Sequence, residues 1–380
     1  MNNNLKPSKI KLILAIRALD IGGAERQFLE LVKKIDRAKF DVLVVTTHKG
    51  ALDKEIEGYP YFNADKNGRW DFKALVRLRK KIREFKAQAI YTFMPDMNIT
   101  LALLKFTSMG NFKLIWGQFG SEPNFADYGK IRRRVYEVQQ KLEFMSDALI
   151  SDGFRGIEFL KKFRHKLENS TVIVSGTDVV RFSRNEEDRI EFRTKHHLTD
   201  SHIAIGICSR LDPMKGYHVL AKAAKRILAK YPNVSFYSIG YGQDSIINDA
   251  MEYLGEYSNR FTWFGKQSKP EWIMSGWDIY CSSSLYGEGF SNSIIEAMAC
   301  SLPVIATDVG DARYQVEGVG LILEPGDDEA LFNSLDNWLN EGAFKQKGIA
   351  SKERAIANFR STLMAKKTED FILKIVEGAK

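Results

Sequence analysis

The strongest constraint on the fold is an alternation of short, β-rich apolar runs with stretches of helical periodicity along most of the chain. This alternation is typical of parallel sheets whose strands are joined by right-handed helical crossovers. The predicted strands of the first half are 11–16, 41–46, 89–93, 112–116, 148–151 and 171–174. After a charged, strand-poor stretch at 181–200, the series restarts with 202–208, 234–239, 261–264, 277–281, 303–307 and 320–323. The sequence therefore predicts an α/β protein with two doubly wound, Rossmann-like domains.

We place the domain boundary at residues 182–183, so that the first domain is 1–182 and the second is 183–360. The last segment, 343–376, has a helical pattern and no further strand. In open α/β sheets, ligands bind beyond the carboxyl ends of the strands. Two such domains facing each other would form an interdomain cleft, which is a favoured place for a small-molecule site.

The charge of the chain is unevenly distributed. The net charge of +8 divides into +11 for residues 1–190 and −3 for the remainder, and the basic excess gathers at 77–83, 130–134 and 161–166. Solvated helix faces explain such clusters, and so does attraction to an anionic membrane surface. Nucleic acid is disfavoured because no nucleic-acid-binding motif accompanies the charge.

Composition indicates a soluble, cytoplasmic protein. No stretch reaches the roughly 20 apolar residues that a spanning helix needs, and residues 1–8 lack the apolar core of a signal peptide. Three cysteines without metal-ligand spacing fit a reducing compartment. The histidines and scattered acids give no metal site, and neither a Ser-His-Asp arrangement nor a Walker loop is present.

The segment 287–299 is the richest in chemistry, because Glu288 and Glu296 stand on either side of a predicted helix start. Helix N-termini attract phosphate through unpaired N–H groups and partial positive charge. Two carboxylates there would hold sugar hydroxyls while the amides hold a phosphate. Glu296 also has a structural explanation, since Ser293-x-x-Glu296 matches a capping box. Glu288 precedes the helix in a glycine-flanked loop, and a solvent-exposed loop acid is its alternative.

Other motifs also follow predicted strands. Arg210 and Lys215 flank a Pro213 turn, and two cations at a strand end suit a diphosphate. Gly22 and Gly23 open the first helix, where glycine permits close approach to an anion. Glycines at 240, 242 and 265 end two later strands and would let a flat base lie against the backbone. Each motif alone is also compatible with an ordinary turn or a surface charge.

Taken in order, these motifs resemble glycosyltransferase family 4. The resemblance rests on Gly22-Gly-Ala-Glu-Arg26, Arg210…Lys215, Gly240-x-Gly242, Gly265, Glu288-x7-Glu296-Ala-Met-Ala and 303–308, and it spans residues 10–327. It implies the GT-B fold, in which the C-terminal helix, residues 361–380, packs back on the first domain. It also implies a retaining transferase that uses a nucleotide sugar, UDP- or GDP-linked, as co-substrate, without a metal or other cofactor.

The resemblance assigns roles by matching position. Arg210 and Lys215 would bind the donor diphosphate, and Glu288 would hold hydroxyls of the transferred sugar; these three form the predicted catalytic group. Glu296 would hold the ribose hydroxyls. The other implied donor-binding residues are Gly22, Gly23, Gly240, Gly265, Lys266, Gly289, Phe290, Ser291, Asn292 and Ser293.

The chain departs from the family pattern on the acceptor side. Members often carry His or Arg in the loop after the fifth strand, where this chain has Phe119, and Asp96 stands where a His is sometimes found. Asp96, Gln118 and Glu122 are therefore the predicted acceptor contacts. In the interdomain turn, Ser175 replaces the usual Asn.

The function we expect is hexosyl transfer to a lipid-linked saccharide in cell-surface polysaccharide synthesis, such as lipopolysaccharide or capsule, at the inner face of the cytoplasmic membrane. A basic first domain would dock on the anionic membrane surface. Retention without a protein nucleophile implies front-face displacement, in which the leaving diphosphate accepts the acceptor's proton. Three alternatives remain: a soluble transferase with a water-soluble acceptor, a GT-B enzyme that epimerises or hydrolyses the nucleotide sugar, and a non-enzymatic sensor that binds the sugar nucleotide without turnover.

Overall fold

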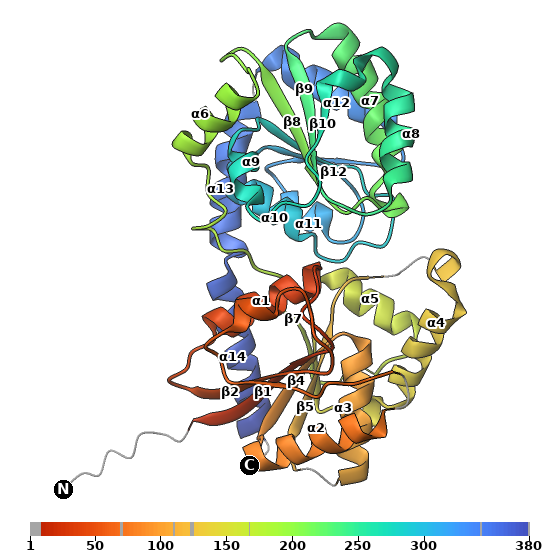
Figure 1. The fold of residues 1–380 in the computed structure, drawn as a ribbon, viewed down its shortest axis with the longest axis vertical. Coiled ribbons are helices and arrows are strands. Elements are labelled where there is room, and N and C mark those ends of the chain that lie inside the picture. Colours follow the sequence, from red (N-terminus) through yellow and green to blue (C-terminus); the bar gives the residue numbers. More distant parts are fainter. Residues whose placement is uncertain are drawn as a thin grey trace, which may run out of the picture. The chain divides into compact units, whose positions relative to one another are not determined.

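The computed structural model describes residues 9–68, 71–108, 111–121, 125–166, 168–342 and 344–378, with the side chains of all of these except 108 and 125–132. The backbone divides into two compact units (Figure 1). Unit 1 comprises Met1–Gly176 and Ser361–Lys380, and unit 2 comprises Thr177–Arg360. The first break therefore falls at Gly176, earlier than the predicted 182–183.

Unit 1 is built on a seven-stranded parallel sheet in the order β3-β2-β1-β4-β5-β6-β7. Its strands are β1 (Ile10–Ile16), β2 (Phe40–Thr46), β3 (Tyr61–Asn63), β4 (Ala89–Phe93), β5 (Lys113–Gln118), β6 (Ala148–Ser151) and β7 (Ser170–Val172). Its helices are α1 (Gly23–Lys34), α2 (Phe72–Phe85), α3 (Pro95–Ser108), α4 (Phe125–Lys141), α5 (Phe154–Lys162) and α14 (Ser361–Glu377), with 3-10 turns η1 (Asp53–Ile56) and η2 (Glu143–Met145).

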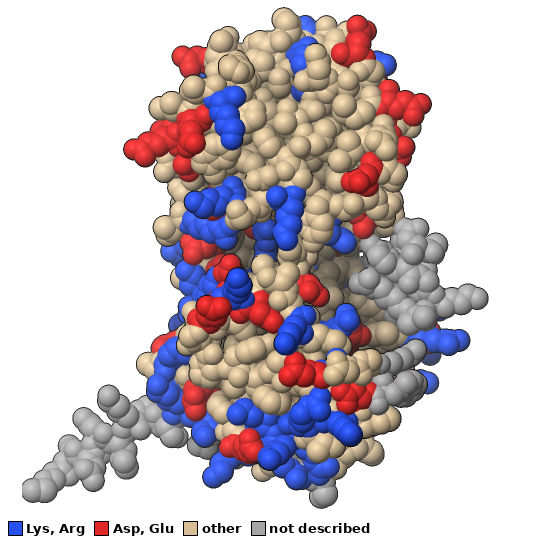
Figure 2. Space-filling view, viewed as in Figure 1, with Lys and Arg blue, Asp and Glu red and all other residues tan. Residues whose placement is uncertain are grey.

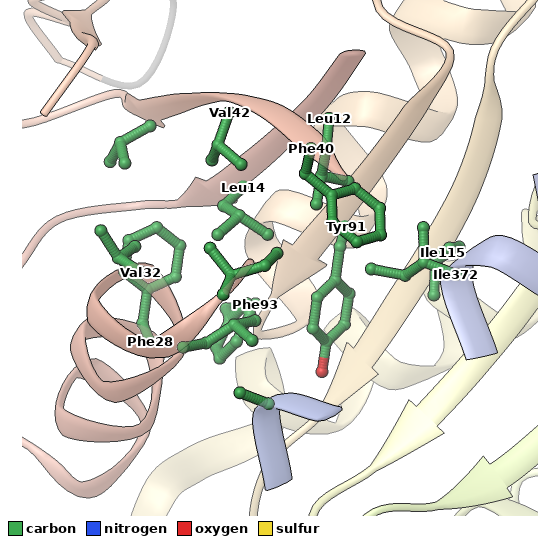
Figure 3. Packing of buried hydrophobic residues seen from close by; sticks show 14 of the residues in the cluster. Leu12, Leu14, Phe28, Val32, Phe40, Val42, Tyr91, Phe93, Ile115 and Ile372 are labelled. Atoms are coloured by element: carbon green, nitrogen blue, oxygen red, sulfur yellow. The ribbon is translucent and has the colours of Figure 1, made fainter. Parts of the chain in front are cut away.

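The sheet of unit 1 is buried on both faces. Along β1, Leu12 and Leu14 join one apolar cluster, while Ile13 joins the cluster on the opposite face. Alternate residues of a strand point to opposite faces, so near-continuous apolar strands indicate helices on both sides. On the first face, Phe28 of α1 meets Phe93 of β4 edge-on, with ring centroids 4.9 Å apart (Figure 3). Helices α2 and α3 cover the other face.

Helix α14 brings the end of the chain into unit 1. Met364, Ala365 and Ile372 belong to the core cluster that contains the α1 side chains. Ile372 is seen beside Ile115 and Tyr91 in Figure 3. The Glu369 carboxylate accepts a hydrogen bond from the Asp36 amide at 2.8 Å, just beyond the end of α1. The final helical stretch is thus part of the first core. It is also not continuous, because α13 (Phe344–Asn358) ends before α14 begins.

Unit 2 repeats the architecture with a six-stranded parallel sheet in the order β10-β9-β8-β11-β12-β13. Its strands are β8 (Ile203–Cys208), β9 (Val234–Ile239), β10 (Phe261–Trp263), β11 (Ile279–Ser282), β12 (Val304–Thr307) and β13 (Leu321–Leu323). Its helices, besides α13, are α6 (Glu186–Lys195), α7 (Tyr217–Lys230), α8 (Asp244–Leu254), α9 (Pro270–Ser275), α10 (Asn292–Ala299), α11 (Ala312–Val316) and α12 (Asp328–Glu341), with 3-10 turns η3 (Pro213–Lys215) and η4 (Gly255–Arg260).

A buried charge network fixes α6 to the sheet of unit 2. The Asp278 carboxylate, just before β11, accepts from Arg189 at 2.7 Å and from Arg193 at 3.2 Å, and also from the Ala204 amide at 2.9 Å. An ionised group is stable away from water only when it is paired and hydrogen-bonded in this way. Asp278 and Ala204 lie at the amino ends of β11 and β8, opposite to the carboxyl ends that carry the motif loops, and both arginines lie on α6. Their charges therefore serve the fold.

The sequence prediction missed β3, an edge strand of three residues whose side chains are partly exposed. A run this short carries too little alternation to be recognised. The other predicted strands are present, with bounds shifted by a few residues.

Candidate active site

The motif loops of unit 2 follow the carboxyl ends of β8, β9, β10, β11 and β12, which all run parallel. The loops therefore meet at one edge of the sheet, where open α/β sheets bind ligands.

The loop after β8 is rigid. Asp212 accepts a hydrogen bond from the Met214 amide at 3.1 Å and so caps η3. Gly216 ends η3 with φ of 62°, and a Cβ built there would lie 2.1 Å from the Ser283 carbonyl oxygen. Only glycine permits this left-handed turn and close approach together. The Ser283 hydroxyl also donates to the Lys215 carbonyl at 2.9 Å. The backbone of Lys215 is thus held against the loop after β11.

Lys215 and Glu288, far apart in sequence, form an ion pair, and each side chain is only 13% exposed. The Ser284 hydroxyl donates a second hydrogen bond to the same carboxylate oxygen at 2.5 Å. Burial acts to raise the pKa of the Glu288 carboxyl. The charge and hydrogen bond of Lys215, with smaller contributions from Ser284 and Arg210, outweigh burial and lower this pKa below its ordinary value. Glu288 is therefore ionised at neutral pH, so it is suited to accept hydrogen bonds and not to donate a proton.

Arg210 contributes a second positive charge to this edge. Its side chain is 53% exposed, and the guanidinium lies 3.7 Å from the Asp212 carboxylate. The Arg210 charge is close enough to lower the pKa of Glu288. The structure thus brings the three predicted catalytic residues into one electrostatically coupled group. A half-exposed guanidinium beside a buried ion pair is suited to bidentate binding of a phosphate.

Backbone packing explains why Gly240 and Gly242, in the loop after β9, are glycines. A Cβ on Gly240 would lie 1.7 Å from the Ser209 carbonyl oxygen, and one on Gly242 would lie 2.2 Å from that of Leu211. Two backbones approach here, and the Gly240 amide donates to the Gly265 carbonyl at 3.0 Å. This packing requires glycine whether or not a base lies against the loop.

Gly265 and Lys266 follow β10. Gly265 has φ of 65° with open space beyond its Cα. The Lys266 ammonium lies 5.9 Å from the centre of the Tyr241 ring, on the neighbouring loop. The open space beside Gly265, next to the exposed ring of Tyr241, remains our predicted location for the base of the donor nucleotide.

The capping box predicted around Glu296 is wrong. Helix α10 begins at Asn292 after Ser291, whose side chain makes no capping hydrogen bond. Ser293 lies inside the helix, and its hydroxyl accepts from Tyr280 of β11 at 2.8 Å. Glu296 lies in the second turn instead of the first and is 5% exposed. The helix start is set by tertiary contacts: Gln315 of α11 accepts from the Ser291 amide at 3.3 Å.

The loop before α10 is folded tightly. Phe290 is 6% exposed and packs its ring against Phe359, so a ligand contact there involves its backbone. Gly289 accepts a hydrogen bond from the Asp311 amide at 3.0 Å. A Cβ on Gly310, φ 61°, would lie 2.3 Å from the Gly289 carbonyl oxygen. The loop after β12 therefore supports the segment that carries Glu288.

Sequence reasoning missed several supporting residues. Ser284 bonds Glu288, and the Thr307 hydroxyl of β12 donates to the Ser284 carbonyl at 2.5 Å. Tyr217 of α7 bonds the Ser209 carbonyl at 3.1 Å, and burial raises its pKa to about 12. The three consecutive serines 282–284 after a buried strand were an available signal for Ser284. The other contacts depend on tertiary packing and leave no local pattern.

In unit 1, Gly22 precedes α1 and Gly23 begins it, as predicted, at the carboxyl end of β1. Asp96 lies exposed in the first turn of α3. It follows Met94, whose φ of 73° is rare outside glycine and is a form of strain common near functional sites. Gln118 is fully buried and donates to the Gly120 carbonyl at 3.1 Å. Glu122 lies outside the described residues.

Phe119, which stands where the resemblance to glycosyltransferase family 4 implies a His or Arg, packs inward. Its ring stacks on Phe93 with centroids 4.4 Å apart. The adjacent Gly120 amide donates to the Asp152 carboxylate at 3.3 Å. The side chain at this position of the chain is thus a core contact.

The described part of the chain contains neither a metal-binding cluster nor a membrane-spanning helix. Within the described residues, no group of three His, Cys, Asp or Glu side chains is arranged to hold a metal ion. Among the described helices, none is long and apolar enough to cross a bilayer.

The architecture is the GT-B fold of glycosyltransferases. The structure of Anabaena Alr3699/HepE in complex with UDP matches it with a TM-score of 0.82 at 19% identity, covering 95% of this chain and 99% of that one. HepE in complex with UDP-glucose gives 0.81 at 20% identity, covering 95% and 98%.

The sequence then defines the family. Profiles described as Glycosyltransferase Family 4 and Glycosyl transferases group 1 match residues 21–151 and 202–341. This chain belongs to glycosyltransferase family 4. An uncharacterized glycosyltransferase of Methanocaldococcus jannaschii is 26% identical over 311 residues, 77% of this chain and 74% of that protein. CapM, a capsular polysaccharide biosynthesis glycosyltransferase of Staphylococcus aureus, is 26% identical over 239 residues, 58% of this chain and 63% of CapM.

Proposed function

We propose that this glycosyltransferase moves a hexosyl residue from a UDP- or GDP-sugar to a hydroxyl of a lipid-linked saccharide, with retention of configuration and without a metal ion. The observation that carries the proposal is the coupled group of Arg210, Lys215 and ionised Glu288 at the carboxyl edge of the unit 2 sheet. The HepE complexes with UDP and UDP-glucose support a nucleotide-sugar donor for this fold.

The chemistry we propose uses these charges in separate roles. Arg210 and Lys215 bind the donor diphosphate and stabilise the negative charge that develops as the glycosidic bond to phosphate breaks. Glu288, being ionised, accepts hydrogen bonds from hydroxyls of the transferred sugar. The leaving phosphate oxygen takes the proton of the acceptor hydroxyl as the new bond forms on the same face. Because two cations supply the stabilising charge, we expect transfer to persist in EDTA.

The remaining donor contacts are proposed by position. Glu296 would hold the ribose hydroxyls, and the start of α10 would offer backbone amides to the phosphates and sugar. On the acceptor side we retain Asp96, which is exposed at the start of α3. Gln118 reaches an acceptor only if its buried side chain is uncovered. Its role therefore ranks below that of Asp96.

The acceptor class and location rest on two supports. CapM is named for capsular polysaccharide biosynthesis, and we propose a related role in cell-surface polysaccharide synthesis for this chain. Helix α2 carries six Lys or Arg and one Glu, and clustered cations are attracted to anionic lipid headgroups. We therefore propose peripheral binding of unit 1 to the cytoplasmic face of the membrane.

The donor assignment is tested by thermal unfolding with a panel of UDP, GDP, UDP-glucose and GDP-mannose. A ligand at a hundredfold excess over its Kd stabilises the folded state by about 2.7 kcal/mol. We expect one nucleotide series to raise the melting temperature of the wild type and not that of Lys215→Ala. A shift that Lys215→Ala retains in full would remove the diphosphate role.

The reaction is tested by incubating the matching radiolabelled donor with lipid extracts. We expect label in the lipid-extractable fraction, with the anomeric configuration of the donor. Label in a water-soluble glycoside would favour the soluble-acceptor alternative. Free or epimerised sugar formed without acceptor would favour an epimerase or hydrolase.

A further inference from the structure

A cavity of about 340 Å³ lies in unit 1, and none of its lining residues is assigned above to the donor or the acceptor. Its wall includes Gln88 and Phe112, which directly precede β4 and β5. It therefore sits at the amino end of the sheet, opposite to the edge where Asp96 follows β4. Its volume falls within the range of small-molecule sites, roughly 300–1,000 Å³, and the proposed transfer reaction makes no use of it.

The floor of the cavity is apolar. Ile82 of α2, Leu104 of α3 and Phe112 line it, and each is exposed by 7% or less. These three side chains favour contact with hydrocarbon, while the amides of Gln88 and Asn111 stand elsewhere in the lining.

Three cations from the end of α2 line the same cavity. Arg79, Arg83 and Lys86 recur at helical spacing, so they stand on one face. None of the three has a carboxylate partner among the residues whose side chains are described. The Nε of Arg79 is buried and makes no hydrogen bond in that part of the chain. Positive charge without a carboxylate partner along one wall favours an anionic occupant.

Nearby acids do not cancel this charge. Asp147 is paired with Lys105 and Lys113. Glu84 is exposed and lies 3.9 Å from Lys80. Figure 2 shows Lys and Arg side chains gathered over the part of unit 1 where α2 lies. The cavity mouth is therefore positive.

Lys86 has a backbone conformation that is unfavourable for a residue with a side chain. Lys86 ends α2 with φ of 55°, the left-handed cap conformation in which glycine is usual. A side chain there costs about 1 kcal/mol or more relative to glycine. The chain keeps a cation at the cavity mouth despite this strain.

The two helices that form the cavity also expose apolar side chains. On α2, Phe72 and Val76 are 65% and 66% exposed, and on α3 Leu103 and Phe106 are 46% and 63% exposed. Basic helices that present aromatic and aliphatic side chains bind at the interface of a bilayer. This surface favours a lipid occupant for the cavity over a protein segment.

We propose that this cavity binds the phosphodiester headgroup of an anionic membrane lipid. Arg79, Arg83 and Lys86 contact the phosphate, and the first carbons of the acyl chains lie against Ile82 and Leu104. The inference rests on the membrane part of the proposed function and adds a specific lipid site to it. The lipid here is an anchor and not the acceptor, because the cavity lies at the end of the sheet remote from the predicted acceptor contact.

The test uses the full chain and dihexanoyl phosphatidylglycerol, a short-chain lipid that is monomeric in water, in a calorimetric titration. We expect saturable binding of one lipid per chain. Arg79→Gln/Arg83→Gln should weaken it at least about tenfold, since each loses a charge-assisted contact. The matched control is Lys73→Gln/Lys80→Gln, which removes the same charge from the same helix outside the cavity and should leave the affinity within about twofold.

Three outcomes would overturn the site. Equal weakening in both double variants would mean that general surface charge, and no pocket, attracts the lipid. Inorganic phosphate binding as tightly as the short-chain lipid would mean an anion site without a lipid. Co-sedimentation with vesicles of phosphatidylglycerol and phosphatidylcholine, against phosphatidylcholine alone, extends the comparison to a bilayer. If only the control loses vesicle binding, the proposal is wrong.

Folding and donor binding provide an independent check. The Arg79→Gln/Arg83→Gln variant should keep the wild-type melting temperature and the nucleotide shift described above. Lys215→Ala should lose the nucleotide shift and keep lipid binding. Failure of the lipid site therefore leaves the donor site intact, and failure of the donor site leaves the lipid site intact.

Discussion

At the scale of single residues, the Lys215–Glu288 pair joins stability to function. Both side chains are largely buried, and Glu288 is held ionised by its partner. Removing one member of a buried pair leaves an uncompensated charge and typically costs about 3 kcal/mol. We expect Lys215→Met to lower the free energy of unfolding by about that amount. The double variant Lys215→Met/Glu288→Gln should recover most of it, as urea unfolding of the four species would show.

The same pair predicts a pH dependence. The pKa of Glu288 lies below its ordinary value of 4.5, so its stabilising contribution is complete above that pH and is lost as pH falls through the lowered pKa. In Lys215→Met, burial raises the pKa of Glu288 and the lysine charge no longer lowers it. Protonation of Glu288 at low pH therefore stabilises the folded variant. The stability difference between wild type and variant should therefore shrink between neutral pH and about pH 3.5. A constant difference over this range would contradict the assignment of Lys215 as the cause.

Steady-state kinetics should distinguish the roles of Glu288, Ser284 and Glu296. Glu288→Gln keeps the shape but removes the charge, and we expect kcat to fall by about 10²–10³. Ser284→Ala removes one hydrogen bond to that carboxylate and should lower kcat about tenfold with little change in the donor KM. Glu296→Gln is expected to act mainly on the donor KM, because we place it at the ribose. Equal KM effects in all three variants would argue against these distinct roles.

Local sequence indicated these residue types but not their pairing. Arg210, Lys215 and Glu288 could be singled out because glycines and predicted strand ends surround them. The ion pair itself depends on Gly216 packing against Ser283, a contact between segments 67 residues apart. No local spacing encodes such a contact, so the sequence assigned the two partners to different parts of a donor.

At the scale of elements, the glycine loops differ in what they tolerate. In Gly240→Ala the new Cβ would lie 1.7 Å from a carbonyl oxygen, so backbone must move, at a cost of about 3 kcal/mol. In Gly265→Ala nothing lies near the new Cβ, and only the left-handed φ costs about 1 kcal/mol. Denaturant unfolding should separate the two variants by this margin. Gly240→Ala should also raise the donor KM, because Ser209 leads directly into Arg210; unchanged KM would separate that loop from the donor site.

Helices and strands were predictable where they are long and have a clear pattern of buried apolar residues. The apolar runs of β1 and β8 and the helical period of α7 are clear in the sequence. The three-residue β3 and the start of α10 were not predictable. The serines around 291–293 offer two possible caps, and the choice is made by Gln315 and Tyr280 from other elements. Tertiary hydrogen bonds, and not the local capping pattern, therefore determine where α10 begins.

At the scale of the whole molecule, separate cores predict separable unfolding. Ile372 of α14 is fully buried in unit 1, and truncating such a residue to alanine costs about 3 kcal/mol. We expect Ile372→Ala to lower the melting transition of unit 1 while nucleotide still stabilises unit 2. Calorimetry with and without UDP measures both. Loss of the nucleotide effect would show that the units unfold as one.

The doubly wound architecture was predictable because strand–helix alternation with a restart admits few other arrangements. The family followed from the joint order of weak motifs, and the matched family profiles confirm it. The cavity beside Arg79 was not predictable. The sequence placed that residue in a basic cluster and left a solvated helix face as one explanation. Which face of the cluster lines a cavity depends on how α2 packs against α3.

The location of α14 has a consequence for the order of synthesis. Unit 2 is one continuous stretch, whereas unit 1 needs Met364, Ala365 and Ile372 from the end of the chain. At about 5–20 residues per second, the ribosome needs about 10–40 s to go from Gly176 to Ile372 of α14. During that interval the first-made part has an apolar face that α14 covers in the folded protein. The second unit can therefore complete its fold before the first, and the nascent chain presents a surface on which chaperones act.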